Sequence, residues 1–167
     1  MKHWAERTRE EQRLLNPSFC SVLLWYAAQG HAAGLDTHPA MPFEETFLVL
    51  PMVMHRDIRD SLPRATTTSL AVWLSDHPLE RATIADRARL LVPFTKEALR
   101  FGGAPGLLQF SHSALVANSD WKRKVTSVLG EASEEVRLCA KRAEFVGKWF
   151  AKAGNAETVL SIVGVRP

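Results

Sequence analysis

The longest unbroken apolar run of the chain lies at residues 47–54. An element that is apolar on every side has no face for solvent, so we expect this run at the centre of the molecule. Residues 55–63 then alternate basic and acidic side chains, which returns the chain to the surface, and Pro63 ends the stretch. We expect a helix from about Glu44, and Pro51 inside it predicts a kink or a split.

Helical spacing of apolar residues predicts several further helices. Asn16-Pro17 is typical of a helix start, because Asn caps a backbone N–H and Pro at the first helical position lacks an N–H that would have no partner. We expect this helix to end at Gly30 and Gly34. The other helices are expected at about 68–77, with caps from the threonines at 66–68, at 79–100, at 131–153 and directly after Asn155.

Residues 107–111 and 114–117 follow a glycine-rich break and predict two short strands with a tight turn at His112-Ser113. A helix pair followed by a hairpin is the order of a winged helix-turn-helix. We therefore predict a mainly α single domain with a small β-hairpin, resembling a winged helix-turn-helix with N- and C-terminal helical additions. Its expected parts are a charged N-terminal arm at 1–15, a helical, winged-helix-like core at 16–118, and a basic loop with C-terminal helices at 119–167.

The helix expected at 131–153 carries two apolar faces separated by a polar stripe. One face is a full core stripe, and the other is a ridge of Leu138, Phe145 and Trp149. A surface helix needs only one apolar face. The ridge therefore packs either under the N-terminal arm of the same chain or against a partner protein.

Residues 47–63 are named here the central stretch, and residues 55–63 are its charged half. If Trp149 belongs to the chain's own core, we expect the partner surface at this charged half. Arg56, Arg59 and Asp60 are the candidate residues there. Their simpler interpretation is a solvated helix end with local ion pairs.

Composition is that of an ordinary globular protein, with 46% hydrophobic and 23% charged residues among 167. The net charge of +3 is concentrated in residues 119–152, which hold eight Lys/Arg against five Asp/Glu. Lys122, Arg123 and Lys124 form a basic cluster beside Trp121, so DNA contact through phosphates is one interpretation and a solvated loop is the other.

Residue patterns that support catalysis are missing from the sequence. Its six histidines have no metal-ligand spacing, and its two cysteines fit reduced, buried thiols. The glycine-rich segment at 102–106 lacks the Gly-Lys-Ser/Thr of a phosphate-binding loop. We therefore predict no catalytic residue, cofactor or metal. The charged N-terminus and the short apolar run predict a cytoplasmic protein without a membrane span, which needs about 20 apolar residues.

Residues 14–20, 50–63, 147–154 and 158–167 together resemble the middle component of three-component ABC systems. These bacterial conflict systems combine an SMC/Rad50-like ABC ATPase, a small middle protein and an effector, and the Lamassu anti-phage systems are related in design. The resemblance implies a protein without chemistry of its own that sits near the ATPase heads and bridges them to an effector such as a nuclease.

A non-catalytic accessory subunit of such an antiviral complex is the leading hypothesis. A stand-alone winged-helix DNA-binding regulator is the second, and an enzyme of unrecognised type is the third. The helix at 79–100 bears on the second, because Glu80 and Asp86 would lie unfavourably beside phosphates if this helix read DNA. A neighbouring gene for a long coiled-coil ATPase would favour the first.

Overall fold

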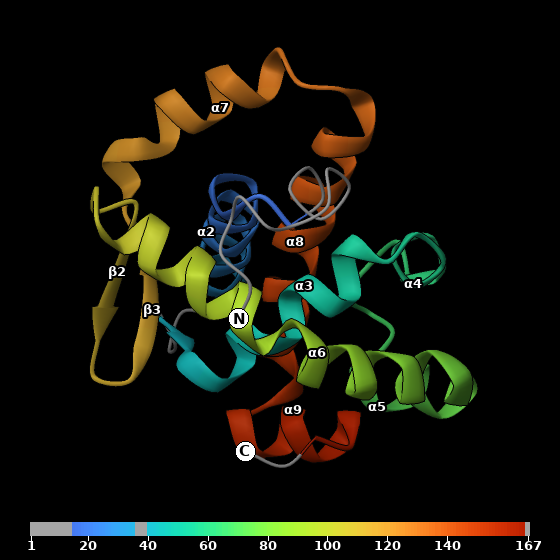
Figure 1. The fold of residues 1–167 in the computed structure, drawn as a ribbon. Coiled ribbons are helices and arrows are strands. Elements are labelled where there is room, and N and C mark those ends of the chain that lie inside the picture. Colours follow the sequence, from blue (N-terminus) through green and yellow to red (C-terminus); the bar gives the residue numbers. More distant parts are fainter. Residues whose placement is uncertain (1–14, 36–39, 166–167) are drawn as a thin grey trace.

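The computed structural model describes residues 15–35 and 40–165, which form a mainly helical fold with a small antiparallel sheet (Figure 1). This confirms the predicted class. The N-terminal arm expected at 1–15 lies, except for Leu15, outside the described residues. The helices are α2 (Pro17–Gly34), α3 (Thr46–Met54), α4 (Arg56–Ser61), α5 (Leu70–Asp76), α6 (Pro78–Gly103), α7 (Lys122–Gly130), α8 (Glu134–Ala153) and α9 (Ala156–Val163), with 3-10 turns η2 (Phe43–Glu45) and η3 (Ser119–Trp121) and strands β1 (Met41–Pro42), β2 (Leu108–Ser111) and β3 (Ala114–Ala117).

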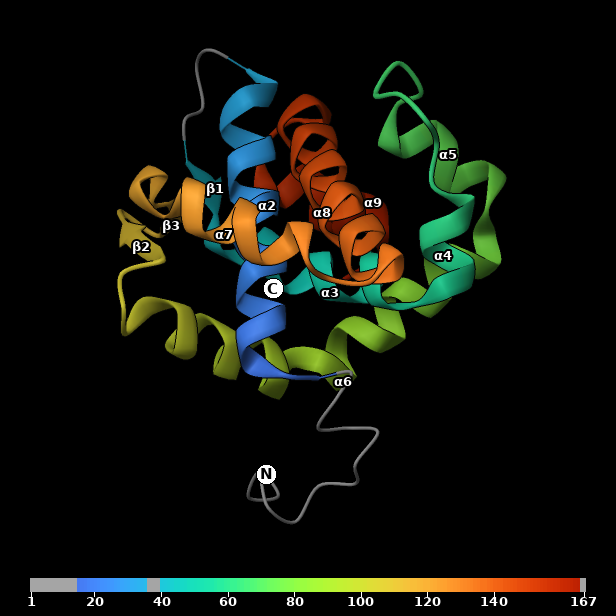
Figure 2. The same ribbon diagram turned by 90° about the horizontal axis from the view of Figure 1, so that it is seen from above.

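α2 and α8 lie side by side and share the most extensive helix–helix contact (Figures 1 and 2). The predicted cap of α2 is confirmed, because the Asn16 side chain accepts a hydrogen bond from the Ser18 N–H at 2.9 Å. Of the two glycines predicted to end the helix, Gly34 is confirmed as its last residue, whereas Gly30 lies inside it. Gly30 instead lies against the backbone of Glu144 in α8, where a side chain would not fit.

α3 occupies the interior, as its unbroken apolar sequence predicts. Leu48, Val49, Leu50, Met52 and Val53 are all fully buried. Pro51 lies inside α3 without splitting it, and the break falls four residues later, at the extended backbone of His55. The proline removes one hydrogen-bond donor from the helix, whereas the change of backbone conformation at His55 ends the helical ladder.

α5 and α6 form the predicted pair and are joined by His77 alone. Ser69 caps α5 by accepting a hydrogen bond from the Val72 N–H at 3.2 Å, so the expectation of a cap from the threonines at 66–68 is wrong. α6 is 26 residues long, includes Pro93 without a break, and ends within the glycine-rich segment.

The predicted hairpin is confirmed, with β2 and β3 paired antiparallel in the register Ser111↔Ala114. His112 and Ser113 form its turn with φ of 47° and 62°, the left-handed conformation that two-residue hairpin turns require. β1 pairs with the other side of β3 and gives the strand order β1-β3-β2. The hairpin is therefore part of a three-stranded sheet, and a winged-helix arrangement stays a prediction.

The basic loop expected from residue 119 is not a loop in the structure. η3 and α7 cover residues 119–130, and Val125 anchors α7 at 6% exposure. Ser133 and Asn155 cap α8 and α9, the second as predicted. Buried side chains from α2 to α9 form one contiguous core, which includes α3.

Candidate functional site

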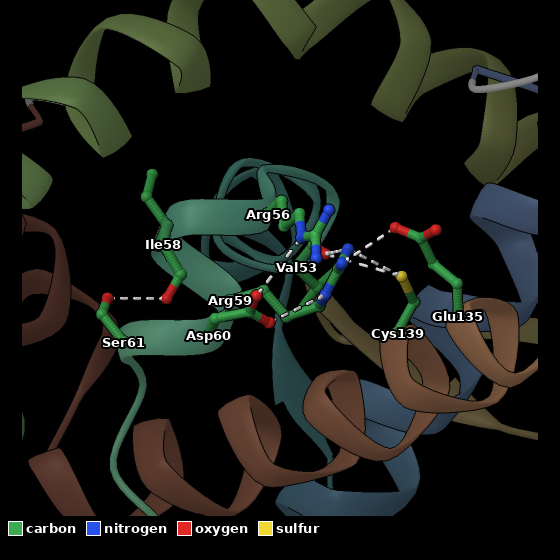
Figure 3. A network of polar contacts seen from close by, with 8 residues as sticks. All are labelled: Val53, Arg56, Ile58, Arg59, Asp60, Ser61, Glu135 and Cys139. Carbon is green, nitrogen blue, oxygen red and sulfur yellow. Dashed lines mark hydrogen bonds and ion pairs between the residues drawn. The ribbon is translucent and has the colours of Figure 1, made fainter.

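α4, the charged half of the central stretch, has an inner and an outer face. Ile58 and Arg59 are 1% and 3% exposed, while Arg56, Asp57 and Asp60 point to solvent. A helix of six residues is too short to be stable alone, so its inner contacts must hold it in place. Figure 3 shows these contacts around Arg59.

The Arg59 guanidinium joins three helices (Figure 3). Its Nη1 donates to the carbonyl oxygen of Val53 in α3 at 3.1 Å and lies 3.2 Å from the Sγ of Cys139 in α8. Its Nη2 donates to Oε1 of Glu135, also in α8, at 2.9 Å. The Val53 carbonyl lies in the last turn of α3, where carbonyl oxygens lack helical partners and a cation is favourable. Arg59 therefore fixes α4 to the end of α3 and to the side of α8.

The positive charge of Arg59 is buried, but its acidic partners are not. Glu135 and Asp60 side chains are 69% and 52% exposed, and Asp60 lies 3.8 Å from the Arg59 Nε. Solvent weakens these two ion pairs, so the guanidinium is held mainly by the buried carbonyl and by packing. Of the three interface candidates on α4, Arg59 is thus an internal tie, and only Arg56 and Asp60 offer charge to a partner.

Arg56 and Asp60 form an exposed ion pair at 3.6 Å, one helical turn apart. Such pairs contribute about 0.3–0.5 kcal/mol, so either side chain can exchange this contact for one with a partner at little cost. The local ion pair predicted as the simpler interpretation is present. The interface role of the two residues remains a prediction.

Cys139 and Cys20 are buried free thiols, as predicted. Burial raises the pKa of Cys139, and the nearby Arg59 charge opposes this shift. Burial raises the pKa of Cys20 to about 12, with a further increase from the Glu97 charge. Neither thiol is activated as a nucleophile at neutral pH.

The ridge of Leu138, Phe145 and Trp149 is covered in part by the chain itself. Trp149 is 1% exposed, and its Nε1 donates to the carbonyl oxygen of Thr68 at 2.7 Å. Its ring also packs edge-on against Trp73 of α5 at a centroid distance of 5.5 Å. Of the two alternatives for the ridge, cover by a partner protein therefore does not hold for Trp149, which the chain itself buries. The covering residues come from α5 and the segment before it, and the N-terminal arm lies outside the described residues.

Leu138 and Phe145 are only partly buried, so their role at an interface stays a prediction. The Phe145 ring lies beside Trp149 at 5.4 Å, with the Arg142 guanidinium 5.9 Å from its centre. Arg142 also donates to the carbonyl oxygen of Pro63, which follows α4. The remaining ridge therefore borders the α4 region.

Lys122, Arg123 and Lys124 are exposed in the first turn of α7. Cations at a helix N-terminus oppose the helix dipole, at about 0.3–1 kcal/mol each at low salt. Lys124 lies 4.6 Å from the centre of the Trp121 ring, which offsets part of this cost. The cluster is thus accessible and locally unfavourable, and its contact with DNA stays a prediction.

One buried ionisable pair was not anticipated from the sequence. Glu45 is fully buried, and its Oε2 lies 3.5 Å from the Nε2 of His31 in α2. Within the described ranges neither carboxylate oxygen has a hydrogen-bond partner. Burial, with a smaller contribution from Glu44, raises the pKa of Glu45 from 4.5 to about 8. Glu45 shares a helical face with Leu48 and Met52, and that spacing was the available signal.

Among residues 15–35 and 40–165, no group of three or more His, Cys, Asp or Glu side chains is placed to hold a metal ion. In the same residues no helix combines the length and the apolar character needed to cross a membrane.

Comparison with known proteins relates nearly the whole chain to one family. Residues 4–167 match the family described as ABC-three component (ABC-3C) system Middle Component 3. The chain matches no curated protein and no solved structure.

Proposed function

Because the chain belongs to the Middle Component 3 family of ABC-three component systems, we propose that it is a non-catalytic accessory subunit of an antiviral complex. It would bridge an SMC/Rad50-like ABC ATPase and an effector, such as a nuclease. The family match over residues 4–167 is the observation that carries this proposal.

The outer face of α4 is the proposed contact with the ATPase. Arg56 and Asp60 lie exposed there, on a helix that Arg59 fixes to α3 and α8. Leu138 and Phe145 would add partly exposed apolar area nearby. A charged pair on a fixed support offers one defined geometry to a partner, which favours a specific contact.

Co-purification of the three components tests this proposal. Reversing both charges, with Arg56→Glu and Asp60→Lys, should release the ATPase while the melting temperature of the isolated chain stays within a few degrees. The matched control reverses two exposed charges away from α4, with Arg81→Glu on α6 and Glu157→Lys on α9, and should retain the ATPase. If the wild-type chain binds neither the ATPase nor the effector, the accessory role is wrong. If the α4 variant keeps the ATPase, the contact lies elsewhere on the chain.

The proposal that the chain has no catalytic activity needs a separate measurement. We expect no ATP hydrolysis and no nuclease activity from the purified chain alone. Turnover that co-elutes with the chain and rises above a mock preparation would contradict this expectation.

A stand-alone winged-helix DNA-binding regulator is the second candidate function. The exposed cations at the start of α7 and the order α5, α6, β2, β3 support it. Reversing Lys122, Arg123 and Lys124 to Glu should reduce weak DNA binding and flatten its salt dependence. Reversing Arg64, Lys141 and Lys152 to Glu is the control. Tight binding with a sequence preference would favour the regulator over the accessory subunit.

A further inference from the structure

Two adjoining hollows along α6 form a surface groove, named here the α6 groove. The first has a volume of about 390 Å³ and is lined by Phe47 and Leu160 among others. The second has a volume of about 370 Å³ and is lined by Phe110 of the hairpin. Phe43 and Lys96 line both hollows, so one ligand could occupy them together.

A row of aromatic rings crosses the groove. The ring centre of Phe43 lies 5.4 Å from that of Phe47 and 6.1 Å from that of Phe110. The Phe110 side chain is 52% exposed at the end of this row. Val92 and Leu160 add aliphatic wall to the first hollow. Concave apolar surface with preformed walls is suited to apolar side chains of a ligand.

Three cations of α6 line the same groove. Arg89, Lys96 and Arg100 are exposed and recur on one side of the helix, at spacings of seven and four residues. Among the described residues that line the two hollows, Glu44 is the one acidic side chain. Arg89 also contacts Asp86 at 3.0 Å, but this exposed pair contributes little and can exchange. The groove therefore has a positive rim above an apolar floor.

We infer that the α6 groove binds an acidic peptide segment of a partner protein, with its carboxylates on the three cations and its apolar side chains in the two hollows. The distance along α6 from Arg89 to Arg100 is about 16 Å, which matches about five residues of extended peptide. The inference rests on the proposed function, because a bridging subunit needs a second contact surface besides α4.

A peptide fits the groove better than a nucleic acid does. Phosphates would satisfy the cations, but they would leave the aliphatic walls at Val92 and Leu160 uncovered. The aromatic rings meet edge-on, at 81° and 61°, and so do not form parallel platforms for stacked bases. Aliphatic and aromatic side chains of a peptide would fill both hollows.

Fluorescence anisotropy with the purified chain tests the groove directly. The probe is a labelled peptide of about 12 residues built from repeats of Glu-Leu-Glu-Phe. The comparison probes are the same peptide with Lys in place of each Glu, and an oligothymidylate of about 12 nucleotides. We expect binding of the acidic peptide alone, weakened at least about tenfold by Lys96→Glu with Arg100→Glu. The control Arg64→Glu with Lys141→Glu should bind the acidic peptide normally. Equal binding of the two peptides, or groove-dependent binding of the oligonucleotide instead, would overturn the inference.

A photo-reactive phenylalanine analogue at position 110, in the chain co-purified with the other two components, tests the groove in the complex. We expect it to crosslink to an acidic segment of the ATPase or the effector, whereas the same analogue at exposed Val72 should not. If the complex forms without this crosslink and the chain does not bind the acidic peptide, peptide binding by the α6 groove is refuted. The accessory role is then unaffected. If the chain binds the acidic peptide but assembles with neither component, the accessory role is refuted and the α6 groove remains a peptide-binding site.

Discussion

Gly30 of α2 and Gly147 of α8 lie in the same helix crossing, each against the backbone of the other helix. A Cβ on Gly30 would overlap the carbonyl oxygen of Glu144, and a Cβ on Gly147 would overlap that of Ala27. The two glycines therefore let the helix backbones approach more closely than any side chain allows. Helix propensity disfavours both positions by about 1 kcal/mol, so their benefit lies in this packing.

Gly30→Ala and Gly147→Ala should each destabilise the chain by about 2–4 kcal/mol, because the added methyl group meets backbone atoms that cannot rotate away. Urea denaturation measures this change. Gly130→Ala is the control, since in the described part of the chain no atom beyond its own stretch of helix lies within 4 Å of a Cβ there, and it should be neutral or slightly stabilising. Equal stability of all three variants would show that the helices are further apart than described.

Trp149→Ala should lower the free energy of unfolding of the isolated chain by about 3–5 kcal/mol, because Trp149 fills space between α8 and α5. This corresponds to a fall in melting temperature of roughly 6–20 °C. Val128→Ala, at a side chain that is 66% exposed, should change the melting temperature little. An unshifted melting curve for Trp149→Ala would return this residue to the list of partner contacts.

Arg59→Met should cost about 2–3 kcal/mol of stability, because it keeps most of the side-chain volume but leaves the Val53 carbonyl with only the weak donor of the Cys139 thiol, 3.7 Å away. The substitution should also loosen α4 over Cys139, so a thiol reagent should modify Cys139 faster under native conditions. Arg56→Met, on the exposed face, should change stability by less than about 0.5 kcal/mol. Similar losses in both variants would argue against the internal role of Arg59.

Glu45 should make stability fall as pH rises. Burial raises its pKa from 4.5 to about 8, so between these values the folded chain holds a proton that the unfolded chain has released. The free energy of unfolding therefore decreases across this window, by at most about 1.4 kcal/mol per pH unit.

Glu45→Gln should remove this slope, whereas Glu44→Gln, at an exposed neighbour, should keep it. Denaturation midpoints at pH 5, 6, 7 and 8 measure both variants. A slope that survives in Glu45→Gln would assign the pH dependence to another group.

Local signals sufficed for the elements whose ends are set by their own residues. Asn16 and Asn155 cap helices as predicted, and His112-Ser113 turns the hairpin, because these contacts lie within a few residues. The burial of Trp149 depends on Thr68 and on Trp73, which are far away in sequence. The periodicity of α8 predicts two apolar faces, but it does not indicate which residues cover the ridge of Leu138, Phe145 and Trp149.

The candidate site was predictable to the same extent. Exposure of Arg56 and Asp60 follows from the charge pattern of the central stretch. The burial of Arg59 does not, because it requires α8 to bring Glu135 and Cys139 beside α4. The helix α7 was not predicted, because its sequence lacks the stripe of buried apolar residues that marks a helix. Its sequence is mostly polar, and Val125 alone is buried.

The Arg59 contacts also bear on the entropy of association. A six-residue helix that had to order itself on a partner would lose conformational freedom of about 1–2 kcal/mol per residue. The contacts of the Arg59 guanidinium order α4 during folding, so this entropy is lost before a partner binds. A ligand of α4 would therefore bind a surface that is already set, and a substitution of the buried Arg59 would alter its affinity without removing a contact with the ligand.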